Sequence, residues 1–216
     1  MPSSLRLHPE PPVVRVELIA DDGFPRLSTS LLRDLDEAFT QLLADSSCQA
    51  IILHGSEKAF AAGAEISELA SLTGTSALDF SRRAQLLFDR IATSPKPVLA
   101  AIRGYCLGGG LDLALACHYR LAAPDARFGH PGATLGLLTG WGGTQRLPRL
   151  LGRTRALELL LLGEPIPAHQ ALQLGLVHEL APPDELMARA VEIVKGLSYR
   201  RERREGAEDA EKTQRT

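Results

Sequence analysis

Three consecutive glycines, Gly108 to Gly110, separate an apolar run from a short apolar helix in residues 100–118, AAIRGYCLGGGLDLALACH. Glycine weakens both strands and helices, so this run indicates a backbone that adopts positive φ or approaches another group closely. Such a turn at a helix N-terminus leaves N–H groups free where partial positive charge collects. The sequence therefore predicts a site for an anion or a developing oxyanion, or else a tight strand-to-helix turn without a ligand. The P-loop ending and the dinucleotide-binding spacing are both absent.

Strand-like and helix-like patterns alternate along the chain. Residues 13–20 alternate as a strand does, and residues 30–46 place leucines at helical spacing behind a Ser/Thr-rich start. The succession recurs, with strands expected at 50–54, 98–102 and 119–122 and helices at 76–91 and 111–117. This alternation predicts an α/β fold with parallel strands joined by crossover helices. The run LELLLL at 157–162 is too short to span a membrane and predicts a buried helix face.

A second small-residue turn, SEKAFAAGAEISEL (56–69), follows the strand-like run AIILHG. Two such turns could place two backbone N–H groups on one acceptor. Together they form part of four ordered blocks that resemble the enoyl-CoA hydratase/isomerase, or crotonase, superfamily. The blocks are KAFAAGAEI (58–66), KPVLAAIRGYCLGGGLDLALAC (96–117), FGHPGATLGLLTGWGGTQRLPRLLG (128–152) and ALELLLLGEPIPAHQALQLGLV (156–177). The resemblance runs from Val13 to Leu197 and implies a crotonase (ClpP-like) spiral of β-β-α repeats.

The resemblance also implies where an acyl-CoA thioester would bind. The backbone N–H groups of Ala64 and Gly109 would form an oxyanion hole for the thioester enolate. Residues 62–67 would line the CoA pocket and Lys58 would lie near its nucleotide end, although Lys58 also fits a solvated surface lysine. Trp141 and Tyr105 fit ordinary core packing as well as a place in the site. The expected substrate- and CoA-binding residues are Lys58, Ala62, Ala64, Glu65, Ile66, Ser67, Tyr105, Leu107, Gly108, Gly109 and Trp141.

Typical hydratases of this family use two glutamates to position water and to deliver a proton to the α-carbon. At the first position this sequence has Asp112, whose side chain is one methylene shorter, and at the second it has Gly132, which has no titratable group. Asp112 is therefore the remaining acid-base candidate, although an acid in the first turn of a helix also fits a simple cap. The catalytic positions that the resemblance implies are thus Ala64, Gly109, Asp112 and Gly132.

The missing second glutamate leaves several functions open. The protein could be a slow or altered hydratase in which Asp112 acts with a second water. A small anion or His130 could occupy the space at Gly132; the naphthoyl-CoA synthases of the superfamily have glycine at this position and are thought to recruit bicarbonate. The chain could instead catalyse isomerisation or decarboxylation, which need only the oxyanion hole and one base. It could also be a non-catalytic acyl-CoA-binding paralogue.

Composition excludes several other classes of partner. A formal net charge of −2 and a pI near 6.3 give no reason to expect nucleic acid or an anionic membrane as partner. The three cysteines, Cys48, Cys106 and Cys117, lie in or beside apolar runs, which indicates reduced, buried thiols. Metal-ligand spacing is absent, and no cofactor is expected beyond the CoA of the substrate. Without a signal-like N-terminus, a cytoplasmic location is expected.

The chain is expected to form one domain, residues 1–198, followed by a charged, disordered tail, residues 199–216. The resemblance implies a helical C-terminal module that packs on the active site or on a neighbouring subunit, and in this sequence the module is expected to be shortened or absent. A homo-oligomer, a trimer or a dimer of trimers, is the expected assembly because the core helices that would meet at the trimer axis are present.

Overall fold

A computed structural model describes residues 3–198 of the chain, which form two sheets. The larger sheet has the strand order β1-β2-β3-β5-β7-β10, and the smaller has the order β4-β6-β8-β9. In the larger sheet the strands are β1 (Ser4–Glu10), β2 (Val13–Ile19), β3 (Ala50–His54), β5 (Val98–Ile102), β7 (Tyr119–Ala122) and β10 (Glu179–Leu180). In the smaller sheet they are β4 (Ala59–Ala61), β6 (Tyr105–Leu107), β8 (Arg127–Gly129) and β9 (Ile166–Pro167).

Consecutive strands are divided between the two sheets. In each of the pairs β3–β4, β5–β6 and β7–β8, the first strand joins the larger sheet and the second joins the smaller one. Helices follow the pairs: α2 (Ile66–Ser71) and α3 (Gly74–Ala92), then α4 (Gly109–Ala116), then the 3₁₀ helix η1 (Pro131–Leu135) and α5 (Gly143–Leu151). This succession confirms the expected β-β-α repeats. It also brings the turns after β4, β6 and β8 to one side of the smaller sheet.

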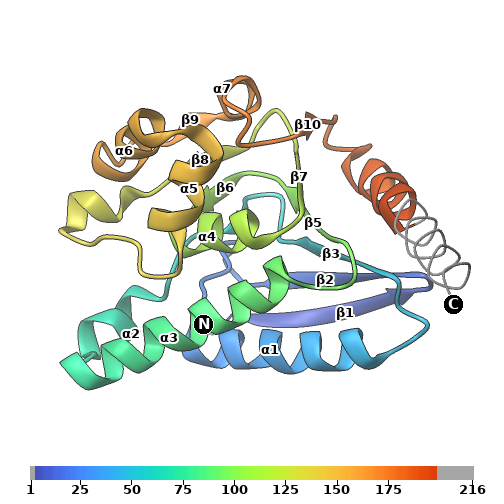
Figure 1. Ribbon diagram of the computed structural model, residues 1–216, viewed down its shortest axis with the longest axis horizontal. Helices are drawn as coiled ribbons and strands as arrows, with labels where there is room; N and C mark the ends of the chain where they lie inside the picture. Colours follow the sequence, from blue (N-terminus) through green and yellow to red (C-terminus); the bar gives the residue numbers. More distant parts are fainter. Residues whose placement is uncertain (1–2, 199–216) are drawn as a thin grey trace, which may run out of the picture.

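The larger sheet is covered on both faces. Helix α1 (Thr29–Ala44) lies beside α3 (Figure 1), and both bury apolar side chains, among them Phe39 and Phe88, in the main core. The opposite face packs against helical residues 186–198, which bury Leu186 and Val194 in a second core. Complete burial of one such side chain contributes ~1.5–3 kcal/mol. The two cores therefore hold the strand ends, and the turns that leave them, in fixed positions.

The predicted strands at 50–54, 98–102 and 119–122 are confirmed to the residue, and they pair in parallel. Strand β1 was not expected, because Pro9 interrupts its apolar alternation. Proline is tolerated there since β1 is an edge strand, paired only with β2 and antiparallel to it. Strand β9 is likewise antiparallel to β8, so the expectation of parallel pairing holds for most of the fold and not for these two strands.

The predicted buried face at 157–162 is only partly correct. Helix α6 (Arg153–Leu161) buries Leu159 and Leu160, whereas Leu157, Leu161 and Leu162 are exposed. Four leucines in a row cannot all face one way, because neighbouring helical positions point about 100° apart. Helix α7 (Ala168–Gln173) follows and packs against β8, β9 and β10.

The three cysteines are free and buried, as predicted. Between residues 3 and 198, no helix is long and apolar enough to cross a membrane. The expected charged tail, residues 199–216, lies outside the described residues.

Candidate functional site

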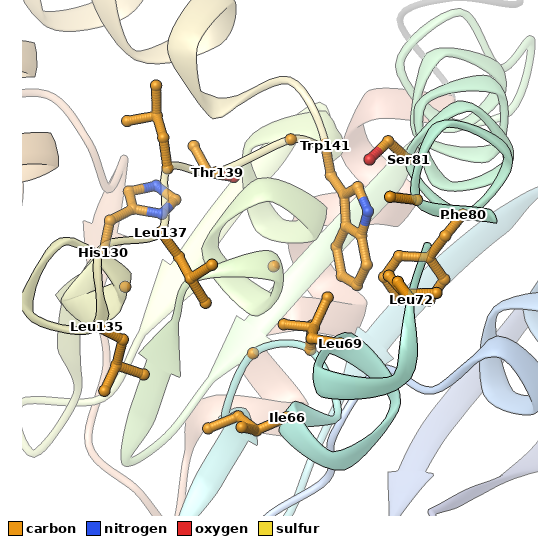
Figure 2. A pocket seen from close by; sticks show the side chains of 18 of the residues that line it. Ile66, Leu69, Leu72, Phe80, Ser81, His130, Leu135, Leu137, Thr139 and Trp141 are labelled. Carbon is orange, nitrogen blue, oxygen red and sulfur yellow. The ribbon is translucent and has the colours of Figure 1, made fainter. Parts of the chain in front are cut away.

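A cavity of about 470 Å³ opens where the turns after β4, β6 and β8 meet. Figure 2 shows Leu72 and Phe80 on one side, with Trp141 and Leu69 beside them, and His130, Leu135 and Leu137 on the other side. Most of its wall is apolar. The apolar lining residues are Ala62, Ala64, Ile66, Leu69, Leu72, Ala77, Phe80, Pro131, Leu135, Leu137, Leu138, Trp141 and Leu160. Such a wall suits an acyl chain or another apolar ligand.

Two glycine-containing turns lie against each other at this cavity. Gly63 has φ +104° and Gly108 has φ +51°, backbone conformations that side chains other than glycine rarely adopt. A Cβ atom built on Gly108 would lie 3.7 Å from the Gly63 Cα atom, so the two backbones are in close approach. Ala64 and Gly109, the residues that follow these glycines, both line the cavity.

The N–H groups of Ala64 and Gly109 are not used by the fold. The residues on either side of Ala64 both bond to Leu27: the Gly63 carbonyl accepts from Leu27 N–H at 2.8 Å, and Glu65 N–H donates to the Leu27 carbonyl at 3.3 Å. Ala64 N–H takes no part in these two bonds. Gly109 is the first residue of α4, where N–H groups have no partner within the helix. Neither N–H has an acceptor among the described residues. Both donors are thus available to a ligand in the cavity.

Trp141 closes the cavity above the glycine turn. It is buried, and its ring packs at 5.2 Å from the ring of Phe80 and at 6.0 Å, edge-on, from that of Phe88. A Cβ atom on Gly109 would overlap the indole ring. Trp141 therefore belongs to the core and also lines the cavity, which are the two positions that the sequence left open.

Asp112 is fully buried on α4 and is not among the described residues that line the cavity. The hydroxyl of Thr139, which does line it, donates a hydrogen bond to Asp112 Oδ2. Burial raises the pKa of Asp112 to about 7, although Thr139, the charge of Arg146 and the backbone of Trp141 and Gly143 all act to lower it. The carboxyl group is therefore connected to the cavity through Thr139 and titrates near neutrality.

His130 lies beside Asp112 and lines the cavity. Its Nε2 atom is 3.6 Å from Asp112 Oδ1, and the side chain is 4% exposed. Both ring nitrogens are buried, and neither has a hydrogen-bond partner among the described residues. Asp112 Oδ1 likewise meets no donor there at full hydrogen-bond geometry, although the Trp141 and Gly143 backbones act on its carboxyl group. Burial lowers the pKa of His130 to about 4, so the imidazole is neutral at ordinary pH. The sequence offered His130 only as a group that could occupy the space at Gly132, because nothing in the sequence shows that residues 112 and 130 meet.

Gly132 lines the cavity at the start of η1 and brings no titratable group to it. Its carbonyl accepts from Leu137 N–H at 2.8 Å, and a Cβ atom on Gly132 would come within 3.2 Å of the Leu137 carbonyl oxygen. A second carboxylate is absent at this position, and the turn leaves little room for one.

Five of the expected binding residues lie outside the cavity lining: Lys58, Glu65, Ser67, Tyr105 and Leu107. Lys58 Nζ donates to the Asp22 carbonyl at 3.1 Å and lies 5.8 Å from the ring centre of Phe24.

Tyr105 is 43% exposed, and its ring centre lies 6.3 Å from that of Phe24, so Lys58 and Tyr105 belong to one surface cluster. Glu65 caps α2 by accepting from the N–H and the hydroxyl of Ser67. Leu107 is a half-buried residue of β6. Ala62, Ala64, Ile66, Gly108, Gly109, Gly132 and Trp141 are brought together around the cavity.

No cluster of three or more His, Cys, Asp or Glu side chains able to hold a metal ion occurs within residues 3–198.

Known proteins resemble this chain in both sequence and structure. A profile of the family "Enoyl-CoA hydratase/isomerase" matches residues 23–204. A probable enoyl-CoA hydratase of Bacillus subtilis is 46% identical over 80% of this chain and 66% of its own length. A short-chain-enoyl-CoA hydratase of Clostridium acetobutylicum is 40% identical over 77% of this chain and 64% of its own. The chain thus spans slightly less than two thirds of these curated relatives.

The crystal structure of an enoyl-CoA hydratase from Bacillus anthracis superposes with a TM-score of 0.84 at 37% identity. The match covers 92% of this chain and 77% of that one. An enoyl-CoA hydratase structure from Thermoplasma volcanium, 30% identical, gives the same TM-score of 0.84 over 95% of this chain and 84% of its own.

Proposed function

This chain belongs to the enoyl-CoA hydratase/isomerase family, and on that premise we propose that it binds an acyl-CoA thioester and stabilises its enolate. The proposed donors are the backbone N–H groups of Ala64 and Gly109. The observation that carries the proposal is the meeting of two glycine turns, each with an unused N–H, at the wall of one apolar cavity.

The chemistry follows from where charge develops. When the α-carbon of a thioester loses a proton, or when a nucleophile adds to the β-carbon of an enoyl thioester, electron density moves onto the carbonyl oxygen. Two fixed N–H donors stabilise that oxyanion more than they stabilise the neutral carbonyl, which lowers the barrier. The apolar wall strengthens the effect, because electrostatic interactions are weakly screened where water is excluded.

The acid-base groups favour chemistry that needs a single base. Gly132 supplies no carboxylate, and Asp112 reaches the cavity only through Thr139 and His130. Among the described residues, the cavity lining therefore lacks the pair of carboxylates that typical hydratases of the family use at the reacting carbons. Proton exchange at the α-carbon, isomerisation of a double bond, or slow hydration are the reactions that the cavity can support.

A second candidate is an acyl-CoA-binding protein without turnover. Two observations favour it, namely the empty side-chain position at Gly132 and the absence of Asp112 from the described residues that line the cavity. Both candidates predict thioester binding, and only the enzyme predicts proton exchange at the α-carbon.

Incubation with crotonyl-CoA in deuterated water distinguishes the two. Loss of the enoyl-thioester absorbance reports hydration, and mass spectrometry reports deuterium at the α-carbon. An enzyme gives deuterium incorporation with or without hydration. Binding of CoA thioesters without hydration or exchange would establish the second candidate and contradict the first.

We also propose a homo-oligomer, a trimer or a dimer of trimers, as the working assembly. Exposed leucines on α5 and α6 support an assembly of some kind, because a monomer would leave Leu150, Leu157 and Leu161 in water. A cytoplasmic location stays a prediction of the sequence.

A further inference from the structure

The buried pair His130 and Asp112 has unused hydrogen-bonding capacity at the cavity wall. Both His130 ring nitrogens are buried and lack a hydrogen-bond partner among the described residues. Asp112 Oδ1 meets no donor there at full hydrogen-bond geometry, although the backbone N–H groups of Trp141 and Gly143 lie close enough to the carboxyl group to lower its pKa. Buried polar atoms are nearly always paired, so the two unpaired ring nitrogens of His130 indicate a missing partner such as a reactant or a water. His130 is the member of the pair that lines the cavity.

The surroundings hold the two side chains toward each other. The Thr139 hydroxyl engages Asp112 Oδ2, which leaves Oδ1 facing His130 Nε2 at 3.6 Å. Gly143, at the start of α5, provides the space for both: a Cβ atom there would overlap Asp112 Oδ1 and lie 3.2 Å from His130 Cε1. A shift of a few tenths of an ångström closes the pair into a hydrogen bond.

We propose that His130 is the general base of this cavity and that Asp112 is its positioning residue. This inference rests on the proposed function and names the group that moves the proton. In the step, the Cα–H bond of the acyl thioester breaks, its electron pair forms the enolate C=C bond, and the carbonyl π pair moves to the oxygen. The proton goes to His130 Nδ1, because Nε2 lies 3.6 Å from Asp112 Oδ1. Nδ1 is buried in this structure, so the step requires a small rotation of the imidazole that brings this atom to the cavity. Return of the proton to the α-carbon gives exchange, and its transfer to the γ-carbon of an enoyl chain gives isomerisation, so neither consumes another reactant.

Asp112 acts by stabilising the imidazolium that forms. Only the ionised carboxylate does this, and since burial raises the pKa of Asp112 to about 7, the rate should fall as the pH drops below that value. Two other titratable groups face Asp112 from the packed elements. Arg146 of α5 lowers its pKa and also donates to Asp89 of α3 at 2.6 Å, and Cys106 of β6 stays a neutral thiol because burial raises its pKa.

The test uses butyryl-CoA in deuterated water, with the initial rate of α-deuterium incorporation measured by mass spectrometry from about pH 5 to about pH 9. His130→Gln keeps a polar side chain without a base and should lower the rate by about 100-fold or more. Thioester affinity, measured by calorimetry, should stay within about twofold, since His130 contributes no binding group in the ground state. His169→Gln, at an exposed histidine of α7, is the matched control and should leave the rate unchanged.

Asp112→Asn separates positioning from a merely structural role. It should lower the rate and remove the inflection near pH 7, while the melting temperature and thioester affinity report that the cavity survives. A His130→Gln rate within about twofold of wild type overturns the assignment of the base, and an unchanged pH profile in Asp112→Asn overturns its positioning role. A wild-type protein that binds butyryl-CoA without exchange contradicts the proposed function as well, so the two failures are distinguishable.

Discussion

Folding changes the proton affinities of His130 and Asp112 in opposite directions. Burial lowers the pKa of His130 from 6.5 to about 4 and raises that of Asp112 from 3.8 to about 7. Between about pH 4 and about pH 6.5 the unfolded chain carries one proton on the histidine, and the folded chain carries one on the aspartate. Both states bind one proton, so the pair gives the free energy of unfolding no net pH dependence in that window.

Replacing either His130 or Asp112 should reveal the pH dependence that the other residue gives to the free energy of unfolding. In Asp112→Asn only His130 of this pair still titrates, and between about pH 4 and 6.5 the unfolded chain binds one more proton than the folded chain. The free energy of unfolding should therefore rise with pH by up to ~1.4 kcal/mol per pH unit in that range. In His130→Gln the folded Asp112 holds a proton that the unfolded chain has lost, so the free energy of unfolding should fall between about pH 4 and 7. Urea unfolding across this range measures both slopes. Variant profiles parallel to that of wild type would contradict the proton transfer on folding.

Trp141 should set both stability and the size of the cavity. Trp141→Ala removes a ring packed against Phe80 and Phe88, and the expected cost is ~3–5 kcal/mol of unfolding free energy. The enlarged cavity should accept bulkier acyl groups, which competition among acyl-CoA esters of increasing size would measure. Trp141→Phe, which keeps an aromatic ring, is the control. An unchanged order of preference in Trp141→Ala would show that the indole does not border the bound acyl chain.

The sequence singled out Asp112 and the glycine turns, because an acid and a glycine run at a helix start are local signals. It did not identify Thr139 as the partner of Asp112 or bring His130 beside it. These residues lie 27 and 18 positions further along the chain, and no periodicity connects them with α4. Only the packing of the loops after β8 onto α4 shows that they meet.

At the scale of elements, the close packing of α4 against β4 depends on Gly110. A Cβ atom on Gly110 would lie 2.7 Å from the Ala61 Cβ atom and would overlap the Ala61 carbonyl oxygen. Strand β4 leads directly into the turn that ends at Ala64. The contact of Gly110 with β4 therefore helps to hold the two proposed oxyanion donors close together.

Gly110→Ala should accordingly destabilise the protein by ~1–3 kcal/mol or more, because the contact is with backbone that cannot move aside. Gly74→Ala is the matched control, since Gly74 starts α3 with no atom within 4 Å of a Cβ position, and it should be neutral or stabilising by up to ~1 kcal/mol. Thermal and urea unfolding of the two variants check the contrast. Equal stability of the two variants would contradict the packing described for α4.

The alternation of apolar runs predicted three strands to the residue, because period-2 and period-3.6 patterns are local. It could not predict that the strands of each pair separate into two sheets, since that depends on contacts between distant segments. The family resemblance supplied this part of the fold. The edge strand β1 escaped prediction because its position at the edge, which makes Pro9 harmless, is itself a tertiary property.

At the scale of the whole molecule, the exposed leucines of α6 bear on assembly. Leu161 and Leu162 are 62% and 66% exposed at neighbouring positions, and contiguous exposed apolar side chains are candidates for a subunit interface. The double variant Leu161→Glu/Leu162→Glu should dissociate the proposed homo-oligomer to a species of 23.3 kDa by light scattering. Leu78→Glu, at a 66% exposed leucine of α3, is the matched control. A wild-type mass of 23.3 kDa would contradict the homo-oligomer altogether.

The central claim is that the N–H groups of Ala64 and Gly109 stabilise a thioester enolate. A side-chain substitution tests it poorly, because Gly109→Pro would also overlap Trp141. Replacing Ala64 by lactic acid exchanges one N–H for an ester oxygen and leaves the side chain and the cavity unchanged. The measurement is the rate of α-deuterium incorporation into butyryl-CoA by this protein and by wild type, with melting temperature and thioester affinity measured alongside. The account predicts a loss of about 10²–10³-fold in rate at nearly unchanged melting temperature and affinity; a rate within about twofold of wild type would contradict it.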